Sequence, residues 1–136
     1  LEHRRQRQMC IRDSLHIIET EYGIETGAMA FQQLVESGTV PTVVFCGNDV
    51  LAVGAMKQAQ KMGFNVPSDI SITGFDDIEI ARVVSPELCT VHVPHRKMGA
   101  RAADILIDMV EGHPYPHTTQ LDASLEIRGS LSAAPK

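Results

Sequence analysis

Residues 41–77, PTVVFCGNDVLAVGAMKQAQKMGFNVPSDISITGFDD, contain strand, helix and strand signals in close succession. The apolar, β-branched run at 42–46 is typical of a strand that is buried on both faces of a parallel sheet. Asn48 is a favourable N-cap for a helix, and Gly63 marks the end of that helix. A turn then leads into 70–75, which predict a second strand.

The alternation of helix and strand continues on both sides of this stretch. Upstream, 16–19 predict a buried strand and 25–36 an amphipathic helix. Downstream, the predicted elements are a short helix (78–84), a strand (89–93), a helix closed by Gly112 (96–111) and an edge strand (124–128). Such alternation with short connections indicates parallel strands joined by right-handed crossovers, so the predicted fold class is α/β.

The composition is that of an ordinary globular domain. The chain has 136 residues, of which 43% are hydrophobic and 21% are charged. No apolar run approaches the roughly 20 residues that a membrane span needs. A net charge of −5 argues against this segment itself binding a nucleic-acid backbone. Three widely spaced cysteines without a CxxC pair disfavour a disulfide framework and suit a reducing cytoplasm.

Two terminal segments differ from the predicted domain, which spans 15–130. Residues 1–14 hold four arginines and show little apolar period, so an anomalous or non-native segment is expected there. The tail at 131–136 is expected to be disordered. Because the first residue is Leu rather than Met, we expect the chain to be a piece of a longer protein.

Polar residues follow three predicted strands, at the edge where open α/β sheets bind ligands. The three clusters are Glu21-Tyr22, Gly47-Asn48-Asp49 and Asp76-Asp77. An aromatic ring that stacks, together with amide and carboxylate groups that fix hydroxyl or N–H groups, suits a polyhydroxylated or heterocyclic ligand.

Each cluster also has a structural explanation. Asn48 caps its helix in either case, and Asp49 is favourable beside the helix dipole. An ordinary turn explains Asp76 and Asp77 equally well, and simple packing explains Tyr22. The occurrence of all three clusters at one edge favours a binding site.

Catalytic and metal-binding patterns are weak in this sequence. The chain has no GxGxxG, GxxxxGK[ST] or GxSxG run, so we predict neither enzymatic activity nor a cofactor. A magnesium or phospho-acceptor role for Asp76 and Asp77 lacks the further acidic residues and the lysine that it needs. Cys46 is expected to be an inert buried residue. Two histidine pairs are expected to be exposed to solvent rather than to bind a metal: His92 with His95, and His113 with His117.

The first turns of the helix after Asn48 are apolar all round, at residues 50–56. One helix face is enough to pack on a sheet, so either both sides are covered within the domain or the outer side meets a partner. Val53 and the segment 83–86 are the candidates for that outer surface.

The stretch 41–77 resembles the effector-binding domain of the LacI/GalR family of bacterial transcription repressors. The resemblance is carried by the runs ND-x-x-A-x-G-A and P-x-D-I-S-x-x-G-F-D-D, followed by the M-G-x-x-A helix, in family order and spacing. Residues 85–112 and 125–130 resemble the closing segments of the family. The resemblance therefore covers about 17–130.

This resemblance implies the type I fold of periplasmic sugar-binding proteins, in which two lobes with parallel doubly wound sheets hold a ligand between them. The chain would be mainly the C-terminal lobe, with the helix at 96–111 crossing to the N-terminal lobe. The family positions that match Tyr22, Asn48 and Asp76 hold the effector. Those that match Val53 and Val84 are dimer contacts.

The implied function is that of the effector-sensing, dimerising part of a cytoplasmic LacI/GalR-type repressor. A small molecule, expected to be a sugar or sugar derivative, would control binding to operator DNA by an N-terminal helix-turn-helix outside this sequence. The alternative is a periplasmic sugar-binding protein of a transport system, and an enzyme ranks third; no membrane partner is expected. A single lobe would leave Met98, Ile105 and Met109 uncovered, which predicts self-association of the isolated chain.

Overall fold

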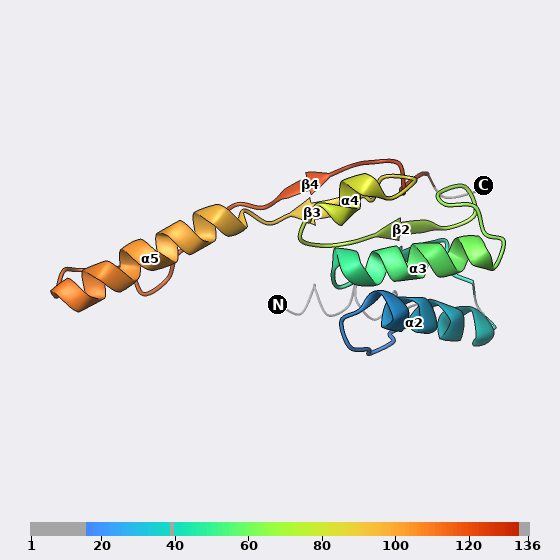
Figure 1. Ribbon diagram of the computed structural model, residues 1–136, viewed down its shortest axis with the longest axis horizontal. Helices are drawn as coiled ribbons and strands as arrows, with labels where there is room; N and C mark the ends of the chain where they lie inside the picture. The colour runs from blue at the N-terminus through green and yellow to red at the C-terminus, as the bar shows by residue number, and fades with distance from the viewer. Residues whose placement is uncertain (1–15, 39, 134–136) are drawn as a thin grey trace, which may run out of the picture.

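The computed structural model describes residues 16–38 and 40–133. Its helices and strands alternate along most of the chain (Figure 1). The elements are α2 (Ile24–Glu36), β1 (Val43–Phe45), α3 (Asp49–Lys61), β2 (Ser71–Thr73), α4 (Ile80–Val83), β3 (Thr90–His92), α5 (His95–Glu111) and β4 (Ser124–Glu126). The predicted helices and the four predicted strands from 42 onward are confirmed, although each strand is shorter than predicted.

The strands form one layer. β1 and β2 are parallel, with Val44 opposite Ile72, and β3 and β4 are antiparallel, with Val91 opposite Leu125. Two isolated parallel bridges join the two pairs. Thr73 in β2 is bridged to Cys89, just before β3, and Asp76, after β2, is bridged to His92 in β3. The α/β class with parallel strands is therefore confirmed, and the antiparallel β4 lies at the edge.

Ser130 links the beginnings of β2 and β3. Its hydroxyl donates to the carbonyl oxygen of Ile72 (2.6 Å) and accepts from the N–H of Cys89 (2.8 Å). Its own N–H donates to the carbonyl oxygen of Glu87, and its carbonyl oxygen accepts from the N–H of Ile72. Because Ser130 is fully buried, these bonds close a gap inside the molecule rather than on its surface.

The core lies between the sheet and α3, which contacts both α2 and α4. In Figure 1, α3 lies between these two helices, so both of its sides are covered within the chain. This arrangement explains why its first turns are apolar all round. The expectation that Val53 faces outward is wrong, because its side chain is 0% exposed. Val84 is partly buried and packs against the same core.

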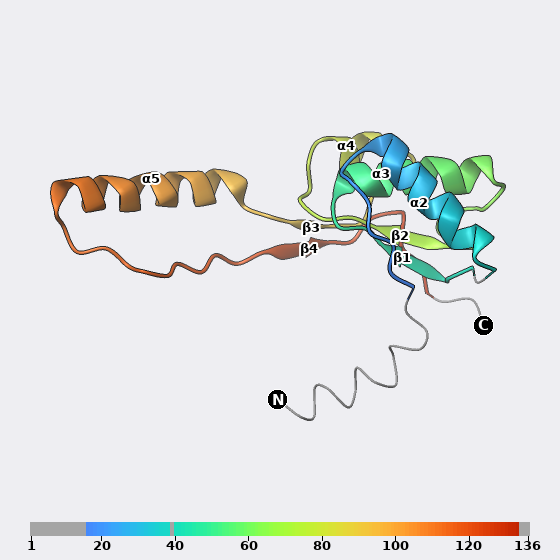
Figure 2. The ribbon, with the colours of Figure 1, turned by 90° about the horizontal axis from the view of Figure 1, so that it is seen from below.

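β1 is buried on one face only, which corrects the expectation for 42–46. Val44 packs against the core, whereas Val43 and Phe45 are 50% and 69% exposed. Figure 2 shows α2, α3 and α4 over the same face of the sheet. Side chains alternate along a strand, so those that point to the other face have no described helix above them.

Residues 16–19, predicted to form a buried strand, are not a strand in the structure. They run beside β1, and His16, Ile18 and Thr20 line a cavity of about 120 Å³ together with residues of β1, α2 and α3. Ile17 is largely exposed. The short apolar run predicted burial, but a strand also requires a hydrogen-bonded ladder, which this segment does not form with β1.

The helix α5 projects away from the rest of the chain (Figures 1 and 2). None of its residues is buried, and Gly112 ends it in the left-handed conformation. The segment 113–123 returns along the helix to β4, so β3 and β4 are the two legs of a long hairpin, here called the α5 hairpin. No helix of the described residues is long and apolar enough to cross a membrane.

Candidate functional site

Two of the three predicted clusters meet at the carboxyl ends of β1 and β2. The N–H of Asp49 donates to the carbonyl oxygen of Phe75 (2.9 Å), and the N–H of Asp76 donates to that of Val91 (2.9 Å). These bonds hold the loop after β1, the loop after β2 and the end of β3 together. No hydrogen bond among the described residues joins Tyr22, in the third cluster, to the other two.

Asp49 has a structural role. Its side chain is fully buried, its Oδ1 accepts from the hydroxyl of Thr90 (2.5 Å), and its Oδ2 accepts from the N–H of Ile78 (2.8 Å). A Cβ atom on Gly74 would overlap Oδ1 of Asp49, so only glycine fits beside this carboxylate. Asp49 thus connects α3 to β3 and to the segment before α4.

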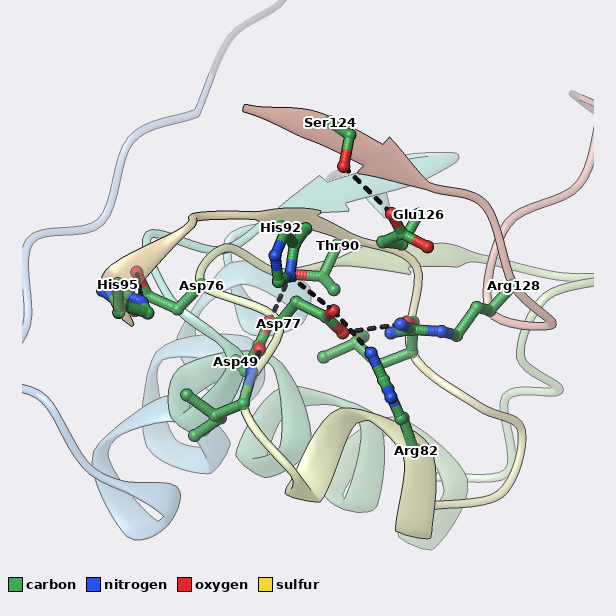
Figure 3. Close-up of polar contacts among 12 residues, drawn as sticks. Asp49, Asp76, Asp77, Arg82, Thr90, His92, His95, Ser124, Glu126 and Arg128 are labelled. Atoms are coloured by element: carbon green, nitrogen blue, oxygen red, sulfur yellow. Dashed lines mark hydrogen bonds and ion pairs between the residues drawn. The ribbon is translucent and has the colours of Figure 1, made fainter. Parts of the chain in front are cut away.

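Asp77 is also buried, and three cationic or protonatable side chains surround it (Figure 3). Its carboxylate lies 2.5 Å from Nη2 of Arg128, 2.9 Å from Nη2 of Arg82 and 2.9 Å from Nδ1 of His92. Burial acts to raise the pKa of Asp77, but the hydrogen bonds from these three side chains outweigh it and lower the pKa below its usual value. Asp77 is therefore a carboxylate whose hydrogen-bonding capacity is used inside the protein.

Asp76 differs from its two acidic neighbours. About one third of its side chain is exposed (34%), and its carboxylate is 3.8 Å from Nε2 of His95, too far for a direct hydrogen bond. Its backbone φ of 106° is in the left-handed half of conformational space, as is the φ of 54° at Asp77. Such backbone strain persists only where the surrounding structure enforces it, and it is common at functional sites.

Asn48 caps α3 as predicted. Its Oδ1 accepts from the N–H of Leu51 (2.8 Å), which leaves its side-chain nitrogen without a hydrogen bond among the described residues. Tyr22 precedes α2 and is 79% exposed, so the packing explanation for this residue does not hold. An exposed ring, an amide nitrogen and a carboxylate thus remain available near the starts of α2, α3 and α4.

The sequence did not reveal the partners of Asp77. His92 was expected to be simply exposed, but its Nδ1 bonds to this carboxylate although 45% of the side chain reaches solvent. Arg82 and Arg128 were not singled out at all. The only indication in the sequence was Arg128, a positively charged residue at the end of the alternating run 124–128.

The remaining candidate residues have no role at this edge. Cys46 is buried as expected, and burial raises the pKa of its thiol to about 12, which favours the neutral form. His113 lies 3.3 Å from Glu111 and 3.7 Å from Asp108, at the far end of α5. Within the described part of the chain, no group of three or more potential ligands is arranged to hold a metal ion.

The comparisons with known proteins agree with this geometry. A family model described as a periplasmic binding protein-like domain matches residues 4–131, and the chain therefore belongs to that family. Its relatives and structural neighbours are LacI-family regulators, and the chain covers only part of the domain that they contain.

Three of these proteins illustrate the similarity. The transcriptional repressor CytR of Escherichia coli K12 is 39% identical over 90% of this chain and 36% of its own length. The crystal structure of the E. coli repressor AscG matches with a TM-score of 0.78 and 32% identity, over 86% of this chain and 42% of that one. A LacI-family regulator from Arthrobacter sp. FB24, in complex with lactose, matches with a TM-score of 0.75 and 26% identity, over 82% and 43%.

Proposed function

We propose that this chain is the effector-sensing part of a LacI-family transcription repressor and that it binds a sugar or a sugar derivative. Tyr22, Asn48 and Asp76 would contact the ligand: the ring by stacking, the amide as a donor and the carboxylate as an acceptor for hydroxyl groups. The Arthrobacter relative was solved with lactose, which supports a ligand of this class.

The observation that carries this proposal is the contrast among the three aspartates at one edge of the sheet. Asp49 and Asp77 use their carboxylates within the protein, whereas Asp76 has no direct side-chain hydrogen bond among the described residues and is held in a strained conformation. A partly exposed carboxylate that the fold holds in place but does not use is suited to binding a polar ligand.

The rest of the function concerns the whole protein, because the chain spans little more than a third of CytR. We propose a cytoplasmic homodimer in which the ligand changes the affinity of a helix-turn-helix, outside this sequence, for operator DNA. Val84 would contact the second copy of the chain in this dimer. Its neighbour Val83, the last residue of α4, is 74% exposed. Val53 is fully buried within the chain, so it is not part of this surface.

The periplasmic transport alternative and an enzymatic role have less support. CytR, AscG and the Arthrobacter protein are all transcriptional regulators. A soluble transport receptor shares the two-lobed fold, so the fold alone does not separate the two functions. The regulatory function is therefore favoured by the relatives rather than by the site.

The proposal is tested by calorimetry on the complete protein that contains this chain. Lactose, D-galactose, D-ribose and cytidine are titrated into the wild type, into Asp76→Ala and into Asp122→Ala. Asp122 is an exposed carboxylate on the return segment and serves as the control. Loss of a charged hydrogen-bond acceptor should weaken binding by about tenfold or more in Asp76→Ala and not in the control.

Two results would contradict the proposal. One is an unchanged affinity in Asp76→Ala with a native melting curve. The other is the lack of a measurable heat for all four probes with the wild-type protein at millimolar concentration.

A further inference from the structure

Asp77 bonds to three different elements at once. Arg82 belongs to α4, His92 is the last residue of β3, and Arg128 follows β4 (Figure 3). Since Asp77 itself follows β2, one carboxylate joins the end of the central sheet to a helix and to two further strands. Its side chain is only 1% exposed, so these bonds are shielded from solvent.

Two of the three partners of Asp77 are on the legs of the α5 hairpin. His92 lies three residues before the first residue of α5, and Arg128 lies on the returning leg. Arg128 also donates through Nη1 to the carbonyl oxygen of Leu88 (3.0 Å), just before β3. The two legs are therefore joined to each other and to the sheet at the point where they leave it.

Besides the backbone bonds that join β3 to Gly74 and Asp76, few contacts in the described chain fix the direction of this hairpin beyond His92. The ladder between its legs has three residue pairs, from Thr90 with Glu126 to His92 with Ser124. No residue of α5 is buried, so the helix has no packed face against the rest of the molecule. An isolated two-stranded ladder of this length is only marginally stable by itself.

We propose that Asp77 is a positioning residue that clamps both legs of the α5 hairpin to the sheet, directly beside the ligand residue Asp76. The bonds to His92 and Arg128 set the direction of α5, whereas the bond to Arg82 only fastens α4. The clamp needs no ligand, so it holds whether or not the site proposed above binds a sugar.

The test compares two substitutions with the same chemistry. Arg128→Gln and Arg82→Gln each remove one arginine from the same carboxylate, but only Arg128 is on a leg of the hairpin. The direction of α5 is measured as the distance distribution between spin labels on Lys61→Cys, at the end of α3, and Val110→Cys, by double electron–electron resonance. Both positions are exposed.

The measurement uses the whole 136-residue chain with Cys10→Ser, and with Leu106→Gln and Ile107→Gln to reduce the exposed apolar surface of α5. The labelled chain is diluted with unlabelled chain so that only distances within one molecule contribute. The distribution should broaden by about twofold or more in Arg128→Gln and stay unchanged in Arg82→Gln. Equal widths in all three proteins, or equal broadening in both variants, would overturn the clamp.

A further variant keeps the test decisive if Arg128→Gln does not fold. His92→Gln removes the bond from the other leg, and its half-exposed side chain makes this substitution milder. It should broaden the distribution as well, and an unchanged width in a folded His92→Gln protein would also overturn the clamp. The calorimetry on Asp76→Ala is a separate experiment that measures ligand binding. The clamp and the ligand site can therefore be disproved independently of each other.

Discussion

Two carboxylates lie inside this small protein, and each is stabilised by a different kind of partner. Asp49 accepts from a hydroxyl and a backbone N–H, both of them neutral donors. Asp77 is stabilised by two arginines and a histidine. A buried charge without such partners would cost several kcal/mol, so both carboxylates depend on the groups that surround them.

Asp77 should make the stability of the protein sensitive to acid. Its folded-state pKa is lowered, so its contribution to stability is present above the ordinary value of about 4 and is lost as the pH falls through the folded-state pKa. Asp77→Asn should lower the free energy of unfolding by about 3 kcal/mol at pH 7, because it leaves the largely buried guanidinium of Arg128 without its counter-charge.

The measurement is thermal melting followed by circular dichroism between pH 7 and pH 3. The melting temperature of the wild type should fall below pH 4, and the fall should be smaller in Asp77→Asn. The exposed Asp122→Asn serves as the control and should follow the wild type. Parallel pH profiles for Asp77→Asn and the wild type would show that Asp77 does not cause the acid sensitivity.

The sequence predicted the site as a set of clusters but did not distinguish residues within a cluster. Asp76 and Asp77 are chemically identical neighbours, and their roles differ because of His92 and Arg128, which are 15 and 51 positions away from Asp77. Local patterns contain no information on such distant partners. The capping role of Asn48, which depends only on the next three residues, was predicted correctly.

The contact between α2 and α3 depends on two glycines. A Cβ atom on Gly54 would overlap the carbonyl oxygen of Ile24, and a Cβ atom on Gly27 would overlap that of Leu51. The helices therefore approach backbone to backbone, which brings Phe31 and Ala55 into one core. Both contacts are with backbone atoms, which cannot move aside by a side-chain rotation.

Gly54→Ala should separate these helices and lower the free energy of unfolding by about 2 kcal/mol, despite the better helix propensity of alanine. Gly99→Ala is the matched control, since Gly99 is also inside a helix but a Cβ atom there would meet nothing within 4 Å. It should leave that free energy unchanged or raise it by about 0.5 kcal/mol. Urea unfolding measures both, and equal effects would show that the close contact has no energetic importance.

At the level of elements, the positions of helices were easier to predict than the burial of their faces. Capping residues and glycines define the ends of α3 within the chain itself. Whether Val53 faces a partner or the interior of the domain depends on tertiary packing, and the apolar pattern was compatible with both. The same holds for 16–19, where an apolar run indicated a strand but no ladder with β1 forms.

For the whole molecule, the α5 hairpin is the feature that most affects behaviour in solution. Five of its apolar side chains are at least 46% exposed on one helix: Met98, Leu106, Ile107, Met109 and Val110. Monomeric soluble proteins rarely expose large apolar patches. In the complete protein this helix is expected to contact the other lobe, as the family resemblance implies.

The isolated chain should therefore self-associate. Sedimentation velocity at two protein concentrations should show species larger than the monomer, and their fraction should increase with concentration. The double substitution Leu106→Gln and Ile107→Gln, at side chains that are 60% and 54% exposed, should shift the distribution toward the monomer. A monodisperse wild-type monomer would contradict this prediction.

The link made by Ser130 has a consequence for how the protein is synthesised. The ribosome makes Ile72 long before Ser130, which follows 58 positions later and completes the hydrogen bonds between the starts of β2 and β3. Until then the backbone groups of Ile72 and Cys89 that bond to Ser130 have only water as a partner, so the starts of β2 and β3 are not yet joined in the nascent sheet. We expect the backbone around Ile72 and Cys89 to become protected from proteases only after the segment that contains Ser130 has left the ribosome, however early α3 forms.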